Sequence, residues 1–373
     1  MRSLGLVLSG GGVRGSAHIG VLQALHEANI KPTYISGTSA GSIVAGLYAY
    51  GYSPQEMLII AKRLSRRSYD LDYPGIITSL INFFFVGKPT ISGLVQGDYL
   101  ERYFTNLTKG CDLKSVKMPL AITAVDINNS KIVVFTSLPV TSHLSAGLSR
   151  RKDLSAFSRL KNAAEPFWWK EASVRFRLKY TFPGAGPAFS VHSAAALATP
   201  STAPQATLSV PAAVVSSAVL TTACTREPSL KDDDYVFLND VRLAEAIRAS
   251  IAIPGIFKPK MIQKMRLVDG GIRANLPVEI TRMMGAQKVI AVNLSYNGRP
   301  VPGVDNILEI SLQAIDLMVY QITRPSIQSA DIIITPEIEY VQQGDLSKID
   351  RLVQSGYQAT MKLMPRIRQL VYN

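Results

Sequence analysis

Cysteine and histidine are scarce in this chain, and their scarcity excludes several classes of protein. The 373 residues include two cysteines, Cys111 and Cys224, which cannot form a disulfide framework and do not match the spacing of a metal site. We therefore expect a protein of a reducing compartment that needs no metal. The histidines number four, and none lies beyond residue 192.

Acidic residues are outnumbered 27 to 40 by lysine and arginine, which gives a formal net charge of +13. A surface of this sign attracts anions such as nucleic acid, anionic lipid head groups or acidic substrates. The chain carries no nucleic-acid recognition motif, so we expect no nucleic-acid partner. The apolar run Leu4–Leu8 is too short for the core of a signal peptide. We expect a cytoplasmic protein, with peripheral attachment to a membrane as a further option.

Regular periodicity is missing from residues 146–230. This segment is rich in alanine, serine, threonine and proline, and it holds Trp168 and Trp169. Prolines interrupt its apolar stretches, so none reaches the ~18 residues that a membrane span needs. We predict a low-complexity insert, largely disordered, within a single folded domain made of residues 1–145 and 235–373.

Outside this insert, strand patterns alternate with helix patterns. Such alternation predicts an α/β fold with a mostly parallel sheet covered by helices on both faces. Strands are expected at 4–8, 120–125, 131–135, 266–268, 288–294 and 331–335, and helices at 16–28, 42–50, 97–108, 239–250, 276–284, 307–320 and 348–371.

The segment Gly37-Thr38-Ser39-Ala40-Gly41 reads Gly-x-Ser-x-Gly between a short strand pattern and an apolar helix pattern. Gly37 and Gly41 permit a tight turn with Ser39 at its apex. A serine so placed is a candidate nucleophile, supported by the positive end of the helix dipole. The runs at 10–15 and 269–271 also follow strand patterns, so we expect all three motifs at the carboxyl edge of one parallel sheet.

A serine hydrolase also needs a base. A Ser-Asp-His triad built on Asp269 needs a later histidine, and the chain has none. The remaining arrangement is a dyad in which Asp269 takes the proton from Ser39 directly. A carboxylate with a pKa of about 3.9 is a weak base, so the dyad requires a desolvated pocket that raises this pKa. The alternative interpretation of Asp269-Gly270-Gly271 is a plain turn after a strand.

The run Gly10-Gly11-Gly12-Val13-Arg14-Gly15 can bring backbone N–H groups together at the start of a helix, where they favour an oxyanion or a phosphate. The same run matches the dinucleotide-binding pattern Gly-x-Gly-x-x-Gly. That pattern requires an acidic residue after the next strand, and residues 28–55 contain none. Arg14 suits either charge balance at the oxyanion or a substrate phosphate, with a surface ion pair as the alternative.

These three motifs, together with Ala249-Ser250-Ile251-Ala252-Ile253-Pro254-Gly255-Ile256-Phe257, resemble the four sequence blocks of the patatin-like phospholipase family, in the same order. The chain is similar to bacterial members, with an unusual insert at 146–230. The resemblance implies a three-layer α/β/α fold, no metal and no cofactor. It also implies the site residues: Ser39 as nucleophile, Asp269 as base, Gly37 and Gly41 in the elbow, and an oxyanion loop of Gly10, Gly11, Gly12 and Val13 with Arg14 beside it.

The resemblance further implies a lipid acyl hydrolase of phospholipase A type that forms an acyl-enzyme on phospholipid or another acyl-ester lipid. The alternatives are a carboxylesterase or lysophospholipase acting on smaller acyl esters, and a lipid-binding protein without turnover. Nothing in the sequence indicates the oligomeric state. Residues 76–86 are apolar and aromatic and follow a basic stretch, so they are either a buried cap over the site or a membrane contact.

Overall fold

The computed structural model describes residues 3–67, 95–140, 234–295, 305, 307–338 and 348–372. All of these belong to one compact unit of the chain. The insert predicted at 146–230 and the apolar stretch at 76–86 lie outside the described residues, so both remain predictions.

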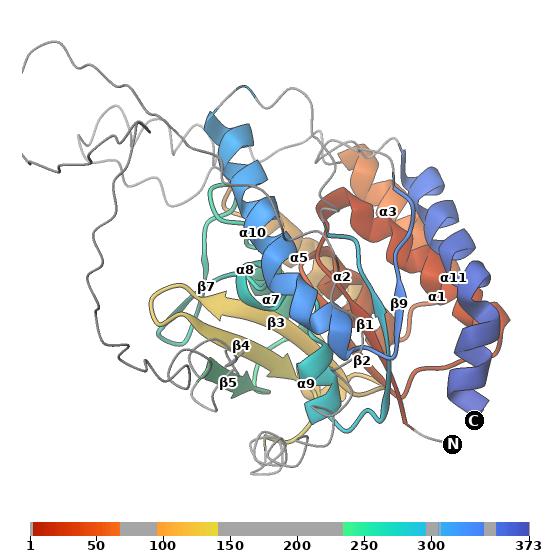
Figure 1. Ribbon diagram of the computed structural model, residues 1–373. Helices are drawn as coiled ribbons and strands as arrows, with labels where there is room; N and C mark the ends of the chain where they lie inside the picture. Colours follow the sequence, from red (N-terminus) through yellow and green to blue (C-terminus); the bar gives the residue numbers. More distant parts are fainter. Residues whose placement is uncertain are drawn as a thin grey trace, which may run out of the picture. The chain divides into compact units, whose positions relative to one another are not determined.

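A single mixed sheet forms the centre of this unit (Figure 1). Its strands run in the order β5-β4-β3-β2-β1-β8-β9, and β7 joins β3 and carries β6 at its outer side. The bounds are β1 Leu4–Leu8, β2 Tyr34–Thr38, β3 Leu120–Asp126, β4 Lys131–Thr136, β5 Tyr235–Leu238, β6 Lys260–Ile262, β7 Met265–Asp269, β8 Lys288–Val292 and β9 Ile332–Ile334.

Parallel pairing dominates the sheet, as the βα alternation predicts. Strands β9, β8, β1, β2 and β3 are parallel neighbours, and β5 is parallel to β4. The antiparallel pairs are β3 with β4, β3 with β7, and β6 with β7. The expectation that all three motifs follow strands of one parallel set is therefore wrong for Asp269, because β7 runs antiparallel to its neighbour.

Alternation along the strands divides the core between the two faces of the sheet. In β1, Leu4, Leu6 and Leu8 belong to the large cluster on one face, while Val7 belongs to a smaller cluster on the other. The large cluster includes side chains of α1 (Ala17–Glu27), α2 (Ala40–Tyr50), α3 (Pro54–Arg67), α5 (Asp98–Leu107), α7 (Leu243–Ser250) and α11 (Ile349–Tyr372). The opposite face packs on α9 (Val278–Met283) and α10 (Ile307–Ser329). The three-layer α/β/α arrangement is thus confirmed.

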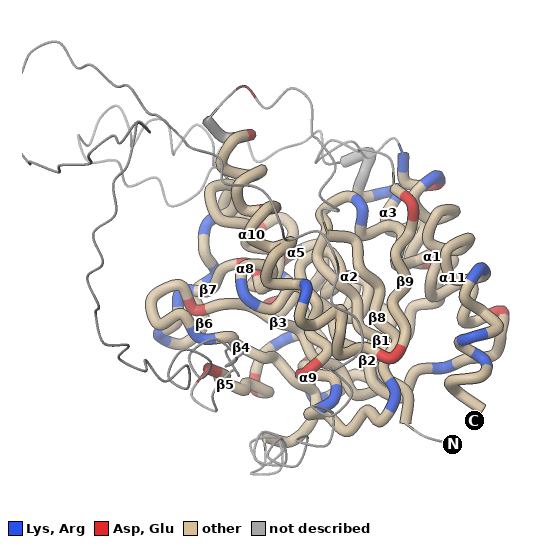
Figure 2. Tube along the Cα trace, in the orientation of Figure 1, with Lys and Arg blue, Asp and Glu red and all other residues tan. Residues whose placement is uncertain are grey.

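Two long helices continue through prolines. Helix α10 runs to Ser329 although the sequence pattern predicts an end near Tyr320, and it contains Pro325. Helix α11 contains Pro365 in the same way. A proline removes one helical hydrogen bond, and packing compensates for it here: Ile327 lies against one core cluster and Met364 in another. In Figure 2, charged residues are common on outer helices such as α11, whereas β1 and β2 contain none.

Candidate active site

Ser39 lies at the tight turn between β2 and α2. Its backbone has φ = 51° and ψ = −124°, a conformation that non-glycine residues rarely adopt outside functional turns. Gly37 and Gly41 allow this turn, because a Cβ atom on Gly37 would clash with the Gly41 carbonyl and one on Gly41 with the carbonyls of Leu8 and Ser9. The Ser39 side chain therefore occupies the apex that its motif predicts.

Asp269 reaches Ser39 because two strands approach each other along β3. Strand β2 runs parallel to the first half of β3 and ends with Thr38 opposite Thr123. Strand β7 runs antiparallel to the second half and ends with Asp269 opposite Ala124. The carboxyl ends of β2 and β7 thus meet at adjacent residues of β3. The strand direction differs from the sequence expectation, yet the two motifs come together.

The Asp269 carboxylate is buried beside Ser39. The two residues are 5% and 7% exposed, so little water reaches them. Burial raises the pKa of Asp269 from 3.8 to about 6, although hydrogen bonds from the Ser39 side chain and the Gly271 N–H oppose the rise. The Gly271 N–H lies 2.7 Å from Oδ1. This is the desolvated environment that a carboxylate needs in order to act as a base.

The glycine run after β1 forms the wall of the site beside Ser39. The Gly10 N–H donates to Oδ1 of Asn275 at 3.1 Å, and the Arg14 N–H donates to the Gly11 carbonyl at 3.1 Å. Both amides are thus already hydrogen-bonded, the first to Asn275 and the second within the loop. The backbone of Gly11 and Gly12 also lines the cavity at Ser39.

The buried side chain of His18 is hydrogen-bonded to the chain directly before this loop. It is fully buried, and burial lowers its pKa to about 4, so the ring is neutral at pH 7. Its Nε2 donates to the Ser9 carbonyl at 2.9 Å, directly before the glycine run. His18 therefore holds the loop in place and is not positioned as a base.

Two residues at the site were not assigned a role from the sequence. Ser250 Oγ accepts a hydrogen bond from the Ser39 N–H at 2.9 Å, and Asn275 connects the glycine loop to Ser295 and Thr323 through its amide nitrogen. Ser250 lies in the third family block, which was the available signal. Asn275 lies six residues after Asp269, and its sequence carries no comparable signal.

Arg14 and helix α10 close the outer side of the site. The Arg14 guanidinium donates from Nε to the Gly11 carbonyl at 3.1 Å and lies 3.8 Å from the Asp316 carboxylate of α10. This ion pair matches the alternative interpretation of Arg14. It also ties α10 to the glycine loop.

The cavity at Ser39 is small and largely apolar. Its volume is about 70 Å³, and it brings together most of the predicted site residues, namely Gly10, Gly11, Gly12, Arg14, Ser39 and Asp269. Gly271, Asn275, Ser295 and Asp316 also line it, together with a set of apolar side chains: Ile253, Pro254, Ile272, Leu312, Ile315 and Val319. Val13 is not among the lining residues, and Gly37 and Gly41 lie behind Ser39 in the elbow.

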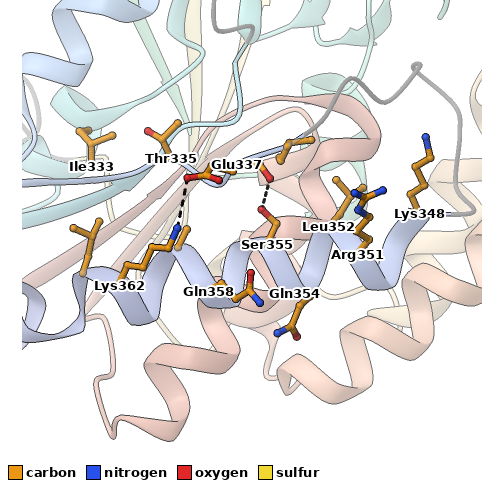
Figure 3. Close-up of a pocket in the computed structure, with 13 residues that line it drawn as sticks. Ile333, Thr335, Glu337, Lys348, Arg351, Leu352, Gln354, Ser355, Gln358 and Lys362 are labelled. Atoms are coloured by element: carbon orange, nitrogen blue, oxygen red, sulfur yellow. Dashed lines mark hydrogen bonds and ion pairs between the residues drawn. The ribbon is translucent and has the colours of Figure 1, made fainter.

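A larger cavity of about 630 Å³ lies elsewhere, between β9 and α11 (Figure 3). Lys348, Arg351 and Lys362 line it, and Lys362 pairs with Glu337 at 3.5 Å. None of its lining residues belongs to the motifs at Ser39 or Asp269. Its volume alone therefore does not mark it as the site of hydrolysis.

The described residues form no candidate metal cluster and no membrane-spanning helix. No three His, Cys, Asp or Glu side chains in this part of the chain lie where they could bind a metal ion together. None of the helices described in the structure is both long and apolar enough to span a bilayer.

Relatives of known name share part of this chain. Lysophospholipase NTE1 of Yarrowia lipolytica is 37% identical over 116 residues, which cover 29% of this chain and 8% of that protein. The NTE1 lysophospholipase of Scheffersomyces stipitis is 39% identical over 116 residues, which cover 28% and 7%. The chain thus spans less than a tenth of the length of these curated relatives.

Two solved structures also resemble the chain. VipD from Legionella pneumophila aligns with 98% of this chain and 67% of its own, with a TM-score of 0.40 and 14% identity. The ExoU–SpcU complex of Pseudomonas aeruginosa aligns with 36% of this chain and 33% of its own, with a TM-score of 0.26 and 22% identity. Both similarities are weak and carry no weight below.

The family profile described as patatin-like phospholipase matches residues 6–282. That match covers well over half of the chain and contains the glycine run, the serine elbow and Asp269. The chain belongs to the patatin-like phospholipase family.

Proposed function

We propose that this chain is a lipid acyl hydrolase in which Ser39 is the nucleophile and Asp269 the base. The observation that carries the proposal is the pairing of these two residues in a buried pocket, where the pKa of Asp269 rises to about 6. A base with a pKa near the working pH is both ionised and able to hold a proton. We treat residues 1–145 and 235–373 as one acyl hydrolase domain.

The proposed reaction proceeds through an acyl-enzyme. Ser39 Oγ attacks the ester carbonyl as Asp269 accepts its proton, and the resulting oxyanion accepts hydrogen bonds from the N–H groups of Gly11, Gly12 and Val13. Each such donor is typically worth ~3–4 kcal/mol in the transition state. Protonated Asp269 then gives its proton to the leaving alcohol. In the second half-reaction Asp269 takes a proton from water as the water oxygen attacks the acyl carbonyl. Asp269 then returns this proton to Ser39 Oγ as the fatty acid leaves.

Lipid esters are the proposed substrates because of the lining of the site. The walls beside Ser39 are formed by Ile253, Pro254, Leu312, Ile315 and Val319, which suit an acyl chain. The family name and the lysophospholipase names of the NTE1 relatives support phospholipid or lysophospholipid as the class. A cytoplasmic protein attached peripherally to a membrane remains part of this proposal.

A carboxylesterase or lysophospholipase acting on smaller esters is the second candidate. The observation that favours it is the small volume of the cavity, about 70 Å³, which suits a small acyl ester better than a large one. Turnover of diacyl phosphatidylcholine, lysophosphatidylcholine and p-nitrophenyl esters of increasing chain length separates these substrates. Turnover that decreases as the acyl chain becomes longer favours the second candidate.

The test compares fatty-acid release by the wild type, Ser39→Ala and Asp269→Asn, each with excess chelator. Chelator-resistant release that both substitutions abolish supports the dyad. Release that survives in either variant contradicts it. A wild-type protein that binds lipid without hydrolysing any of these esters supports the alternative of a non-catalytic lipid-binding protein.

A further inference from the structure

Helix α10 presents one face to the catalytic cavity. Leu312, Ile315, Asp316 and Val319 line that cavity, and the buried Thr323 accepts a hydrogen bond from Asn275. These positions recur at the spacing of one helix face. A substrate that enters the cavity from this side therefore passes along helix α10.

The opposite face of α10 is apolar and exposed. Ile310, Leu317, Met318 and Ile322 are 54%, 47%, 60% and 39% exposed, which makes four of the eleven large apolar side chains that the described residues expose. At 100° per residue, these four fall within an arc of about 140°. Among the residues whose side chains the structure describes, the other positions of this arc are Ser311, Ala314, Gln321, Pro325, Gln328 and Ser329, and none is charged. We call the face formed by Ile310, Leu317, Met318 and Ile322 the outer stripe.

Charged residues of α10 lie outside the outer stripe. Glu309 and Asp316 are on the other side of the helix, and Asp316 is turned towards Arg14. The exposed Arg324 lies next to the stripe, about 20° beyond Leu317. Figure 2 accordingly shows little charge along most of the helix. A helix face exposed to water is ordinarily polar, so a contiguous uncharged apolar face indicates a surface that contacts an apolar partner.

A lipid surface fits this face better than other partners do. The stripe lies on the same helix that lines the catalytic cavity, so a bilayer that contacts it is adjacent to the site where acyl esters are cleaved. The formal net charge of +13, summed over the whole chain, attracts it to an anionic bilayer, and the basic residue of α10, Arg324, lies at the edge of the stripe. A helix lying in the plane of the interface buries an apolar face of this kind and leaves its opposite face towards the protein.

We propose that the outer stripe of α10 docks the protein onto anionic phospholipid bilayers and thereby brings the Ser39 cavity to its lipid substrate. This inference rests on the proposed function for the identity of the substrate, but docking itself is independent of hydrolysis.

The experiment uses the full chain and vesicles of phosphatidylcholine mixed with phosphatidylglycerol. The test variant carries Leu317→Gln together with Met318→Gln, which removes apolar surface and keeps side chains that favour a helix. The matched control is Met261→Gln on β6, because Met261 is 53% exposed and lies outside the outer stripe. Vesicle sedimentation measures binding, and hydrolysis is measured with vesicle phospholipid and with monomeric p-nitrophenyl butyrate.

The double variant is expected to lose about tenfold in vesicle affinity, because two apolar side chains no longer enter the interface. It should lose activity on vesicle phospholipid much more than on p-nitrophenyl butyrate, and Met261→Gln should lose neither. Unchanged vesicle binding in the double variant overturns the proposal. An equal loss in Met261→Gln also overturns it, as does a double variant that changes only the oligomeric state in size-exclusion chromatography.

Vesicle binding and ester hydrolysis, measured separately in the wild type and in Ser39→Ala, separate this inference from the proposed function. Vesicle binding through the stripe without any hydrolysis by the wild type means that docking holds and the enzymatic proposal fails. Hydrolysis of p-nitrophenyl butyrate by a wild type that does not bind vesicles means the reverse.

Discussion

The two cavities of this molecule differ in size, lining and chemistry. The cavity between β9 and α11 is about nine times larger than the one at Ser39, and its lining mixes lysine, arginine and glutamine with apolar side chains such as Leu352 and Leu363. The cavity at Ser39 has mostly apolar walls, and it joins residues from positions 10 to 319 of the chain. The small cavity contains the Ser39 hydroxyl beside the Asp269 carboxylate, whose pKa is raised. Chemical function here follows from which groups are buried together and not from the volume available.

Among substitutions in the two cavities, Asp269→Asn in the cavity at Ser39 is expected to have the largest effect. The amide cannot accept the Ser39 proton, so kcat/KM for p-nitrophenyl butyrate should fall by about 10³-fold or more. The same substitution should stabilise the fold at pH 8. At 1.36 kcal/mol for each pKa unit, the rise from 3.8 to about 6 makes the ionised carboxylate cost the folded state about 3 kcal/mol.

The sign of this stability effect depends on pH. Because the folded-state pKa is raised, the contribution of protonated Asp269 is present below pH 3.8 and is lost as the pH rises through about 6. Urea unfolding should therefore show that Asp269→Asn stabilises the protein at pH 8 and has little effect at pH 4. An equal effect at both pH values would contradict burial as the cause of the raised pKa.

The pH dependence of the wild type tests the same carboxylate without a mutation. Only ionised Asp269 accepts a proton, so kcat/KM should fall about tenfold for each pH unit below about 6. Stopped assays with p-nitrophenyl butyrate between pH 4 and 8 measure this slope. A break near pH 4 instead would mean that Asp269 is solvated, as the groups of the larger cavity are.

Ser250→Ala should have a smaller effect than the loss of the base. It leaves the buried Ser39 N–H without its acceptor, and an unpaired buried donor costs about 1–3 kcal/mol. We expect kcat to fall about tenfold with KM little changed. Ser42→Ala is the matched control in the same turn, because the Ser39 carbonyl keeps the hydrogen bond from the Ser42 N–H at 2.8 Å. Equal losses in both variants would mean that Ser250 has no special role.

Lys362→Ala in the larger cavity should have the smallest effect on activity and stability. Its ion pair with Glu337 joins side chains that are 71% and 88% exposed, and exposed pairs contribute little. Neither ester hydrolysis nor the urea midpoint should change measurably. A loss of activity comparable to that of Ser250→Ala would show that the two cavities are coupled, and the contrast drawn above would then fail.

Local sequence patterns predicted the elements that carry the site. The apolar run at β1, the serine turn before α2 and the run before Asp269 each depend on residues close in sequence, and helices on both faces follow from the alternation. Strand direction does not depend on neighbours in this way. Strand β7 is antiparallel because of its pairing with β3, to which it is distant in sequence, so the pattern at 266–268 could not indicate it.

Other parts of the site depend on contacts between distant residues. The hydrogen bond between Ser250 and Ser39 joins residues 211 positions apart in the sequence. The one between Asn275 and Gly10 joins residues 265 positions apart. The cover of the cavity by α10 arises in the same way, through Asp316 and Arg14. Sequence patterns also did not predict α3, β5 and β6. Helix α3 is amphipathic, but it lies between the recognised motifs, where no element was predicted. Strands β5 and β6 have only four and three residues, which is too short for a clear pattern.

The most direct test of the dyad is labelling of the wild type with a fluorophosphonate, followed by peptide mass spectrometry. The account predicts one covalent label, located on Ser39, that is absent from Ser39→Ala and forms much more slowly in Asp269→Asn. A label on another residue, or labelling of Ser39→Ala at the wild-type rate, would contradict Ser39 as the nucleophile.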